Sequence, residues 1–244
     1  MKNILNPMNP FFRFMNLVVD LVGVNLLFLL CCIPVITIGP ALSALYTITM
    51  RLVRNTCETP VKSFWKAFRL NMKQGILLEL IVLGIGALLL YNTWLTVQLR
   101  IDQPSTFHLI LFVLCVICLV LSAAILVYLF PLLAQFNNTV KGILQNAFLM
   151  SIRHLPTTFC LAVIPIVVGW LAMRGVGIFA FISVALVLIG FVLIAYLQSL
   201  MLVRIFDTYI KQLNEEEEQA AIHKAEGALL ETADLQQEES ILQN

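Results

Sequence analysis

The chain has 244 residues, of which 60% are hydrophobic and only 12% are charged, and its mean hydropathy is +0.94. A soluble domain of this length needs a polar surface, and about a quarter of its residues are normally charged. The composition therefore excludes an ordinary water-soluble globule and predicts a protein that is embedded in a lipid bilayer.

The net charge of +1 hides an uneven distribution along the chain. Residues 1–213 carry 14 Lys and Arg against 5 acids, whereas residues 214–244 carry 1 against 9. We therefore predict a transmembrane domain over 1–213 and an acidic cytoplasmic tail over 214–244, and we expect no nucleic-acid partner. Because the tail is rich in Glu and poor in apolar residues, it is predicted to be partly helical or disordered.

Five apolar stretches are long enough to cross about 30 Å of hydrocarbon, which takes roughly 20 helical residues. They cover approximately residues 17–38, 76–97, 107–133, 157–173 and 177–203. The predicted fold class is all-α, namely a polytopic transmembrane helical bundle of about five spans with amphipathic cytoplasmic helices. Membrane lipids are therefore its expected surroundings.

The predicted orientation follows from Lys and Arg, which are enriched in cytoplasmic loops. Ten basic residues lie on one side of the predicted spans: Arg51, Arg54, Lys62, Lys66, Arg69, Lys73, Lys141, Arg153, Arg204 and Lys211. The other side has four: Lys2, Arg13, Arg100 and Arg174. This bias predicts a multi-pass protein of the cell membrane with its C-terminus in the cytoplasm and its N-terminus outside.

The first apolar segment leaves two alternatives open. Residues 17–50 are almost continuously apolar but are interrupted by Pro34, Gly39 and Pro40. As a helix they would measure about 51 Å, which is too long for one crossing and short for two. One alternative is a span followed by a re-entrant or interfacial segment over about 34–50. The other is a cleaved signal peptide.

Polar residues recur within or beside the first predicted span. Arg13, Asn16 and Asp20 follow one another at helical spacing, so they share a face, and Asn25 comes slightly later. Glu79 stands one turn inside the second predicted span. Ionisable groups inside a membrane are functional candidates, although the simpler reading is a polar face that packs on another helix or lies at the interface. The candidate polar intramembrane site consists of Arg13, Asn16, Asp20, Asn25 and Glu79.

A second candidate is an amphipathic helix between the first two spans. Its aromatic residues Phe64, Trp65 and Phe68 share one face with Val61 and Met72, and its other face is basic. Such a helix is predicted to lie along the inner leaflet, where Lys and Arg meet anionic headgroups. It could instead dock a soluble partner. The candidate membrane or partner docking helix is defined by Phe64, Trp65, Lys66, Phe68, Arg69 and Lys73.

Residues 134–155 resemble a second copy of that helix. Ala67-Phe68 is followed by Lys73 and Ala147-Phe148 by Arg153, five positions after the Phe in both cases. Each copy then leads into a two-span hairpin. This suggests two parallel repeats, an arrangement found in transporters, although chance similarity is the alternative.

Recognisable catalytic chemistry is missing from the sequence. Five of the six cysteines lie in apolar runs, and the Cys115-x-x-Cys118 spacing has no further metal ligands nearby. There is no nucleophile elbow, zinc-binding helix motif, phosphate loop or dinucleotide fingerprint. We therefore predict no catalytic, cofactor-binding or metal-binding residues, no cofactor and no enzymatic activity.

Several motifs resemble the YesL-like family of bacterial integral membrane proteins, a domain family of unknown function. The resemblance is most specific in the first 75 residues and weaker up to about 205. The residues that carry it are Asn9-Pro10-Phe11-Phe12-Arg13-Phe14, Asp20, Asn25, Cys32 to Leu42, Ala44-Leu45-Tyr46, Arg54, Phe64 to Arg69, Asn71, Lys73-Gln74 and Phe130-Pro131-Leu132-Leu133.

The resemblance implies a role accessory to carbohydrate uptake, because members are often encoded beside carbohydrate ABC-transport genes. It implies no catalytic or ligand-binding residues. The first hypothesis is therefore a membrane protein that assists or regulates sugar uptake by contacting ABC transporter components. The alternative is a solute transporter or permease in its own right, for which five spans would favour a homo-oligomer.

Overall fold

The structure is a computed structural model, which describes residues 10–57, 59–102, 105–136, 138–174, 189–212, 214–215, 218–219 and 222. The chain forms two compact units, Met1–Leu200 and Met201–Asn244. Seven helical segments have defined bounds: α1 (Pro10–Cys31), η1 (Val35–Thr37), α2 (Ile38–Val53), α3 (Pro60–Asp102), α4 (Thr106–Gln135), α5 (Val140–Arg153) and α6 (Leu155–Arg174). A further helical stretch covers Ile189–Gln212.

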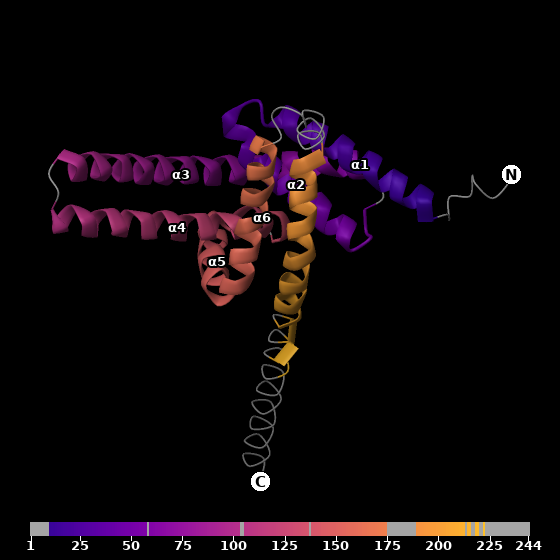
Figure 1. Cartoon of the computed structure of the whole chain (residues 1–244). Coiled ribbons are helices and arrows are strands. Elements are labelled where there is room, and N and C mark those ends of the chain that lie inside the picture. Colours follow the sequence, from indigo (N-terminus) through magenta and orange to yellow (C-terminus); the bar gives the residue numbers. More distant parts are fainter. Residues whose placement is uncertain are drawn as a thin grey trace, which may run out of the picture. The chain divides into compact units, whose positions relative to one another are not determined.

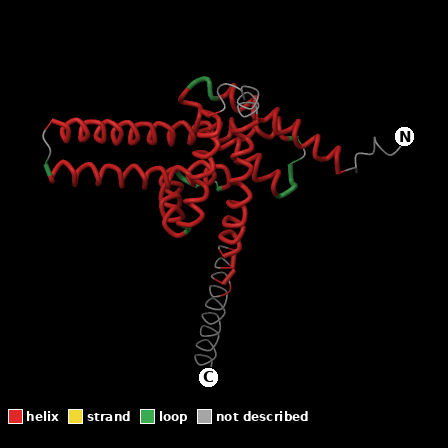
Figure 2. The backbone as a smooth tube through the Cα atoms, viewed as in Figure 1, coloured by secondary structure: helices red, strands yellow, loops and turns green. Residues whose placement is uncertain are grey.

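The all-α prediction is confirmed, because the described residues contain helices and no strands (Figures 1 and 2). Four helices are long and apolar enough to cross a bilayer, or five if the bent pair Val140–Arg153 and Leu155–Trp170 counts as one span. The prediction of a multi-pass membrane protein with about five spans therefore holds. The proposed boundary between residues 213 and 214 stays a prediction.

The first predicted span, 17–38, is interrupted in the structure. Helix α1 ends at Cys31, and the Thr37 hydroxyl donates to the carbonyls of Cys31, at 2.6 Å, and Pro34, at 2.8 Å. Pro34 has no N–H and disfavours helical backbone at the residue before it, which explains the break. After the break the chain forms a second helix, α2, whose residues are mostly buried. An interfacial helix would keep one face outside the protein, so α2 is instead an internal helix of the bundle.

Helix α3 joins two elements that the sequence analysis separates. The predicted docking helix and the predicted span 76–97 form one unbroken helix of 43 residues. At 1.5 Å per residue it is about 64 Å long, roughly twice the hydrocarbon thickness. The amphipathic helix is therefore not separate from the following span, and its place along the inner leaflet stays a prediction. No proline interrupts residues 61–75, and Gly75 serves a close helix contact instead of a bend.

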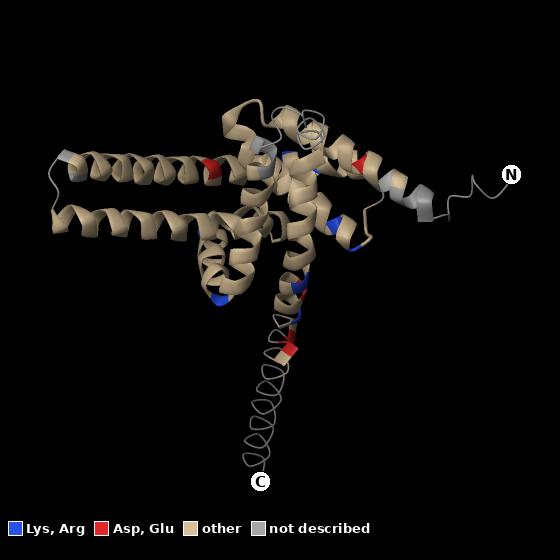
Figure 3. Cartoon of the chain, viewed as in Figure 1, with Lys and Arg blue, Asp and Glu red and all other residues tan. Residues whose placement is uncertain are grey.

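Helices α3 and α4 lie side by side as a hairpin (Figure 1). Figure 3 shows that the described residues of this hairpin are uncharged over most of its length. Its large apolar side chains are exposed, among them Leu88, Trp94, Ile110 and Val120. Water would penalise such a surface, so this surface is suited to contact with lipid.

The second suspected copy has a different geometry from the first. Helices α5 and α6 are bent by 101° at a short break, whereas α3 is continuous. Pro156 follows this break, and proline disfavours helical backbone before it. Phe68 is buried but its counterpart Phe148 is exposed. The proposed repeat is therefore not reflected in these two segments.

Helix α2 is the centre of the first unit. Its small residues Ala41, Ser43 and Ala44 are buried, which lets neighbouring helices approach closely. Hydrogen bonds then link α2 to its neighbours: Asn71 donates to Ser43 at 2.8 Å, and the Thr49 and Ser199 hydroxyls bond at 2.7 Å. Because α2 has small buried side chains and hydrogen bonds to its neighbours, it positions the elements around it.

In the second unit the helix continues to Gln212. Lys211 and Glu215 form an exposed ion pair at 3.7 Å with i,i+4 spacing, which is a common surface interaction in helices. Most of the predicted acidic tail lies outside the described residues.

Candidate intramembrane pocket

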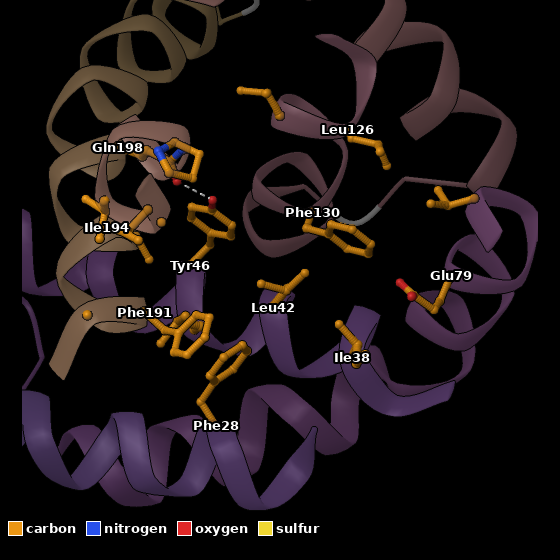
Figure 4. Close-up of a pocket in the computed structure, with 18 residues that line it drawn as sticks. Phe28, Ile38, Leu42, Tyr46, Glu79, Leu126, Phe130, Phe191, Ile194 and Gln198 are labelled. Atoms are coloured by element: carbon orange, nitrogen blue, oxygen red, sulfur yellow. Dashed lines mark hydrogen bonds between the residues drawn. The ribbon is translucent and has the colours of Figure 1, made fainter. Parts of the chain in front are cut away.

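The first unit contains a pocket with a volume of about 550 Å³. Residues from α1, α2, α3, α4, α6 and the stretch 190–198 line it (Figure 4). Fifteen of the 18 lining residues have apolar side chains or are glycine, and the other three are Tyr46, Glu79 and Gln198. The volume is within the range of small-molecule sites, and the lining is typical of them: mostly apolar with a few polar groups.

Glu79 is the acidic residue of this lining. Its side chain is only 6% exposed, and in Figure 4 its carboxyl group points into the pocket. Among the described residues it forms no hydrogen bond and no ion pair. A buried polar group without a partner is costly, by about 1–3 kcal/mol in proteins and more when it is charged. The position of Glu79 therefore lowers the stability of the fold and is not explained by packing.

Two glycines bring Glu79 to the pocket. A β-carbon on Gly39 would lie 2.6 Å from the Gly75 carbonyl oxygen, and one on Gly75 would lie 2.8 Å from the Pro40 nitrogen. The backbones of α2 and α3 therefore touch where the two glycines meet. Glu79 follows Gly75 by one turn, and its β-carbon would lie 3.0 Å from that β-carbon on Gly39. The carboxyl-bearing residue is thus fixed beside the first turn of α2.

The other two polar side chains of the lining satisfy each other. The Tyr46 hydroxyl donates to Gln198 Oε1 at 2.6 Å, and Gln198 Nε2 donates to the Leu161 carbonyl at 2.8 Å. Gln198 is 5% exposed, so this chain of bonds links α2, the stretch 189–212 and α6 inside the protein. In the view of Figure 4, Leu42 and Phe130 lie between this pair and Glu79.

The five residues of the predicted polar site do not form one cluster. The side chains of Arg13 and Asn16 lie outside those that the structure describes. Asp20 is half-buried on α1 and does not line the pocket. Asn25 is fully buried, and its Oδ1 accepts a hydrogen bond from the Val192 backbone at 3.1 Å. Of the three members whose side chains are described, Glu79 lines the pocket, and Asp20 and Asn25 do not.

Asp20 and Glu79 are near opposite ends of α2. Glu79 is next to Gly39 in the first turn of that helix, whereas Asp20 acts electrostatically on Cys57, which follows its last turn. Since α2 has 16 residues, these ends are about 24 Å apart. The two acids therefore cannot act as a pair.

The pKa of the Cys57 thiol depends on its burial and on neighbouring charges. Burial raises the pKa of the Cys57 thiol, and the negative charge of Asp20 raises it further. The hydrogen bond to Ser63 and the charge of Arg51 act in the opposite direction. A raised pKa lowers the fraction of this thiol that is ionised at neutral pH.

The candidate docking helix is divided by burial. Phe64 and Phe68 belong to the hydrophobic core with Leu21 of α1 and Ala44 of α2. Both rings are unavailable to lipid or to a partner, which corrects the predicted aromatic face. The exposed members are Trp65, Lys66, Arg69 and Lys73, with the Arg69 guanidinium 5.0 Å from the centre of the Trp65 ring.

The cysteines are free thiols, and within the described residues no group of three or more His, Cys, Asp and Glu could hold a metal ion. Two features of the pocket are absent from the sequence analysis. In the sequence, Tyr46 belongs to the Ala44-Leu45-Tyr46 motif and Gln198 to the fifth apolar stretch, and neither pattern indicates a pocket. The signal for Gln198 was a single amide within an apolar run, which needs a hydrogen-bond partner when buried.

Comparison with known proteins gives two matches. Residues 21–93 match the family described as "Protein of unknown function, DUF624", and this range includes Gly39, Gly75 and Glu79. An "Uncharacterized protein YteU" of Bacillus subtilis (strain 168) is 26% identical over 181 residues, which cover 72% of this chain and 78% of that protein. No solved structure matches. The similarity supports relationship to an uncharacterised family, and the narrower YesL-like assignment stays a prediction.

Proposed function

We propose that the protein is an accessory membrane protein of carbohydrate uptake that acts on a transporter by contact and does not carry the sugar itself. The observation that carries this choice is the lining of the pocket. A sugar presents many hydroxyl groups, and a site for it must match them with hydrogen-bonding side chains. The pocket offers three such side chains, of which Tyr46 and Gln198 already bond each other.

The contact surface in this proposal is the exposed part of the docking helix, formed by Trp65, Lys66, Arg69 and Lys73. A tryptophan beside several cations is suited to an acidic partner surface, because Trp and Arg are enriched at the centres of interfaces. The resemblance of residues 9–75 to the YesL-like family supports components of a carbohydrate ABC transporter as that partner. The proposal places this surface in the cytoplasm and the N-terminus outside a bacterial cell membrane, and it includes no catalytic step.

A deletion strain and a charge-reversal variant test this proposal. Loss of the gene should reduce uptake of a sugar that an ABC transporter carries, and mild-detergent affinity purification should recover a component of that transporter. Reversing the surface with Lys66→Glu and Arg69→Glu should abolish the recovery. Lys141→Glu, which changes one exposed cation on α5, serves as the control. Unchanged uptake together with no recovered transporter component would reject the accessory role.

A second candidate function is a solute carrier, and Glu79 is the observation that favours it. Carboxyl groups buried within membrane helices often mark the path of an ion or solute. Flux of a solute into vesicles that contain only this protein should then depend on Glu79 and should be lost in Glu79→Gln. Flux that survives Glu79→Gln would exclude the pocket as its route, and flux that survives Asp20→Asn and Asn25→Ala would exclude those two residues.

A further inference from the structure

Three properties of the pocket define the chemistry of an occupant. The lining residues other than Tyr46, Glu79 and Gln198 offer only apolar surface, so the body of the occupant is apolar. Tyr46 and Gln198 are bonded to protein groups, so they offer little to an additional polar group. Glu79 is left without a partner among the described residues. The occupant therefore carries one polar group, and that group must satisfy a carboxyl.

The surroundings of Glu79 favour a cationic group. No lining residue is basic, so the protein supplies no counter-ion within the pocket. Phe130 and Glu79 flank the same point, because a β-carbon on Gly39 would lie 3.0 Å from Phe130 Cε1 and 3.0 Å from Glu79 Cβ. The carboxyl group attracts an organic cation by its charge, and Phe130 adds an aromatic wall close to the same point.

The apolar wall fits a hydrocarbon chain. Phe28 of α1 and Phe191 form a tilted pair with ring centroids 5.6 Å apart, and both line the pocket together with Leu42 and Ile194 (Figure 4). Burying a chain against such side chains contributes about 25 cal/mol per Å² of apolar surface. The wall thus supplies affinity, and Glu79 supplies selectivity for the head group.

We propose that the pocket is a binding site for an amphiphile with a primary ammonium head and a hydrocarbon chain, with the head held by Glu79 beside Phe130 and the chain lying against Phe28 and Phe191. A free alkylamine and the ethanolamine head of a phospholipid present this same chemistry. The site does not depend on the proposed role in sugar uptake, because it rests on the pocket and not on the docking helix.

The test uses the full chain in phosphatidylcholine nanodiscs and a photoactivatable dodecylamine with a diazirine in its chain. The amine should label peptides that contain pocket residues, and mass spectrometry locates the labels. Glu79→Gln should lower this labelling about ten-fold or more, which corresponds to the loss of one charge-assisted hydrogen bond. The matching dodecanol probe, which has no cation, should label the pocket weakly in both proteins.

A second variant tests the chain-binding part without touching the carboxyl. Gly169 lines the pocket, and a β-carbon there would meet nothing within 4 Å, so Gly169→Leu should fill space without a backbone clash. It should reduce labelling by both probes. Gly84→Leu is the matched control, because a β-carbon on Gly84 also meets nothing within 4 Å and Gly84 does not line the pocket. Size-exclusion profiles identical to that of the native protein establish that each variant folds.

Nanodiscs that contain phosphatidylethanolamine distinguish the two sources of the head group. If the lipid suppresses amine labelling of the pocket, the site holds a lipid head group, and if labelling is unchanged, it holds a free amphiphile. Either result agrees with the proposal. Equal labelling of the native protein and Glu79→Gln, or equal labelling by the amine and the alcohol, would overturn it, and neither outcome affects the test of sugar uptake.

Discussion

Two polar side chains in one apolar pocket have opposite bonding states. Gln198 is 5% exposed and uses both ends of its amide, one toward Tyr46 and one toward Leu161, whereas Glu79 is 6% exposed and has no partner among the described residues. The two hydrogen bonds of Gln198 join helices, and they offset the free-energy cost of burying its amide. Glu79 contributes no such link. The difference separates a structural polar group from one that is available for a ligand.

The largest expected effect comes from the helix contact that positions Glu79. In Gly39→Ala the added β-carbon would lie 2.6 Å from a backbone oxygen of Gly75, which cannot rotate away. We expect the free energy of unfolding to fall by about 3 kcal/mol, at the upper end for overpacked cores. The control Gly84→Ala should be neutral or stabilising by up to about 1 kcal/mol, since alanine is the better helix former. Thermal unfolding in detergent, followed by circular dichroism, measures both, and equal melting temperatures would contradict the close contact.

Gln198 and Glu79 should respond unequally to substitution. Gln198→Leu should lower the free energy of unfolding by about 1–3 kcal/mol, because it leaves the Tyr46 hydroxyl and the Leu161 carbonyl buried without their partner. Glu79→Gln should change it by less than about 0.5 kcal/mol or raise it, because a buried carboxyl is replaced by a neutral amide. Thermal unfolding of both variants checks this, and a loss in Glu79→Gln as large as that in Gln198→Leu would refute the distinction.

A smaller effect is expected from Tyr46→Phe, which removes one donor and keeps the ring. Gln198 then retains its bond to Leu161 but loses the bond from the Tyr46 hydroxyl. The expected loss is about 1 kcal/mol. A double-mutant cycle with Gln198→Leu should give a coupling energy of about 0.5–1.5 kcal/mol, and additive losses would show that the 2.6 Å bond contributes nothing.

The smallest effect concerns the separation of the two acids. Because the charge of Asp20 raises the pKa of the Cys57 thiol, Asp20→Asn should lower that pKa and increase the thiolate fraction at pH 8. In a protein that keeps Cys57 as its single cysteine, alkylation at pH 8 should become faster. Glu79→Gln should leave the rate unchanged, because Glu79 is near the other end of α2. A faster rate in Glu79→Gln would contradict this separation.

The overall class of the fold could be predicted from the sequence, because hydrophobic runs of about 20 residues are a strong signal. The details of the first 75 residues could not. Residues 61–73 have the pattern of a surface helix, yet Phe64 and Phe68 are buried under α1 and α2, since periodicity reports one apolar face without saying whether lipid or protein covers it. The join with the following span was missed for a related reason, because polar residues such as Asn71 and Lys73 do not end a helix.

The candidate site was predicted only through Glu79. Its grouping with Asp20 and Asn25 assumed that polar residues inside a membrane meet each other, whereas Asn25 bonds to the Val192 backbone and Asp20 acts on Cys57. Their true neighbours are far apart along the chain, and single-sequence spacing does not report such contacts. Gly39 and Gly75 stood within or next to the motifs of the predicted family resemblance, but their role in bringing α2 against α3 required the structure.

The most direct test of the central claim is infrared difference spectroscopy of the Glu79 carboxyl in phosphatidylcholine nanodiscs. Subtracting the spectrum of Glu79→Gln from that of the native protein isolates the carboxyl bands of this residue. Addition of dodecylamine should shift those bands, and dodecanol should leave them in place, because an ammonium group pairs with the carboxyl. Carboxyl bands that stay unchanged while dodecylamine saturates the nanodisc would contradict a ligand site at Glu79.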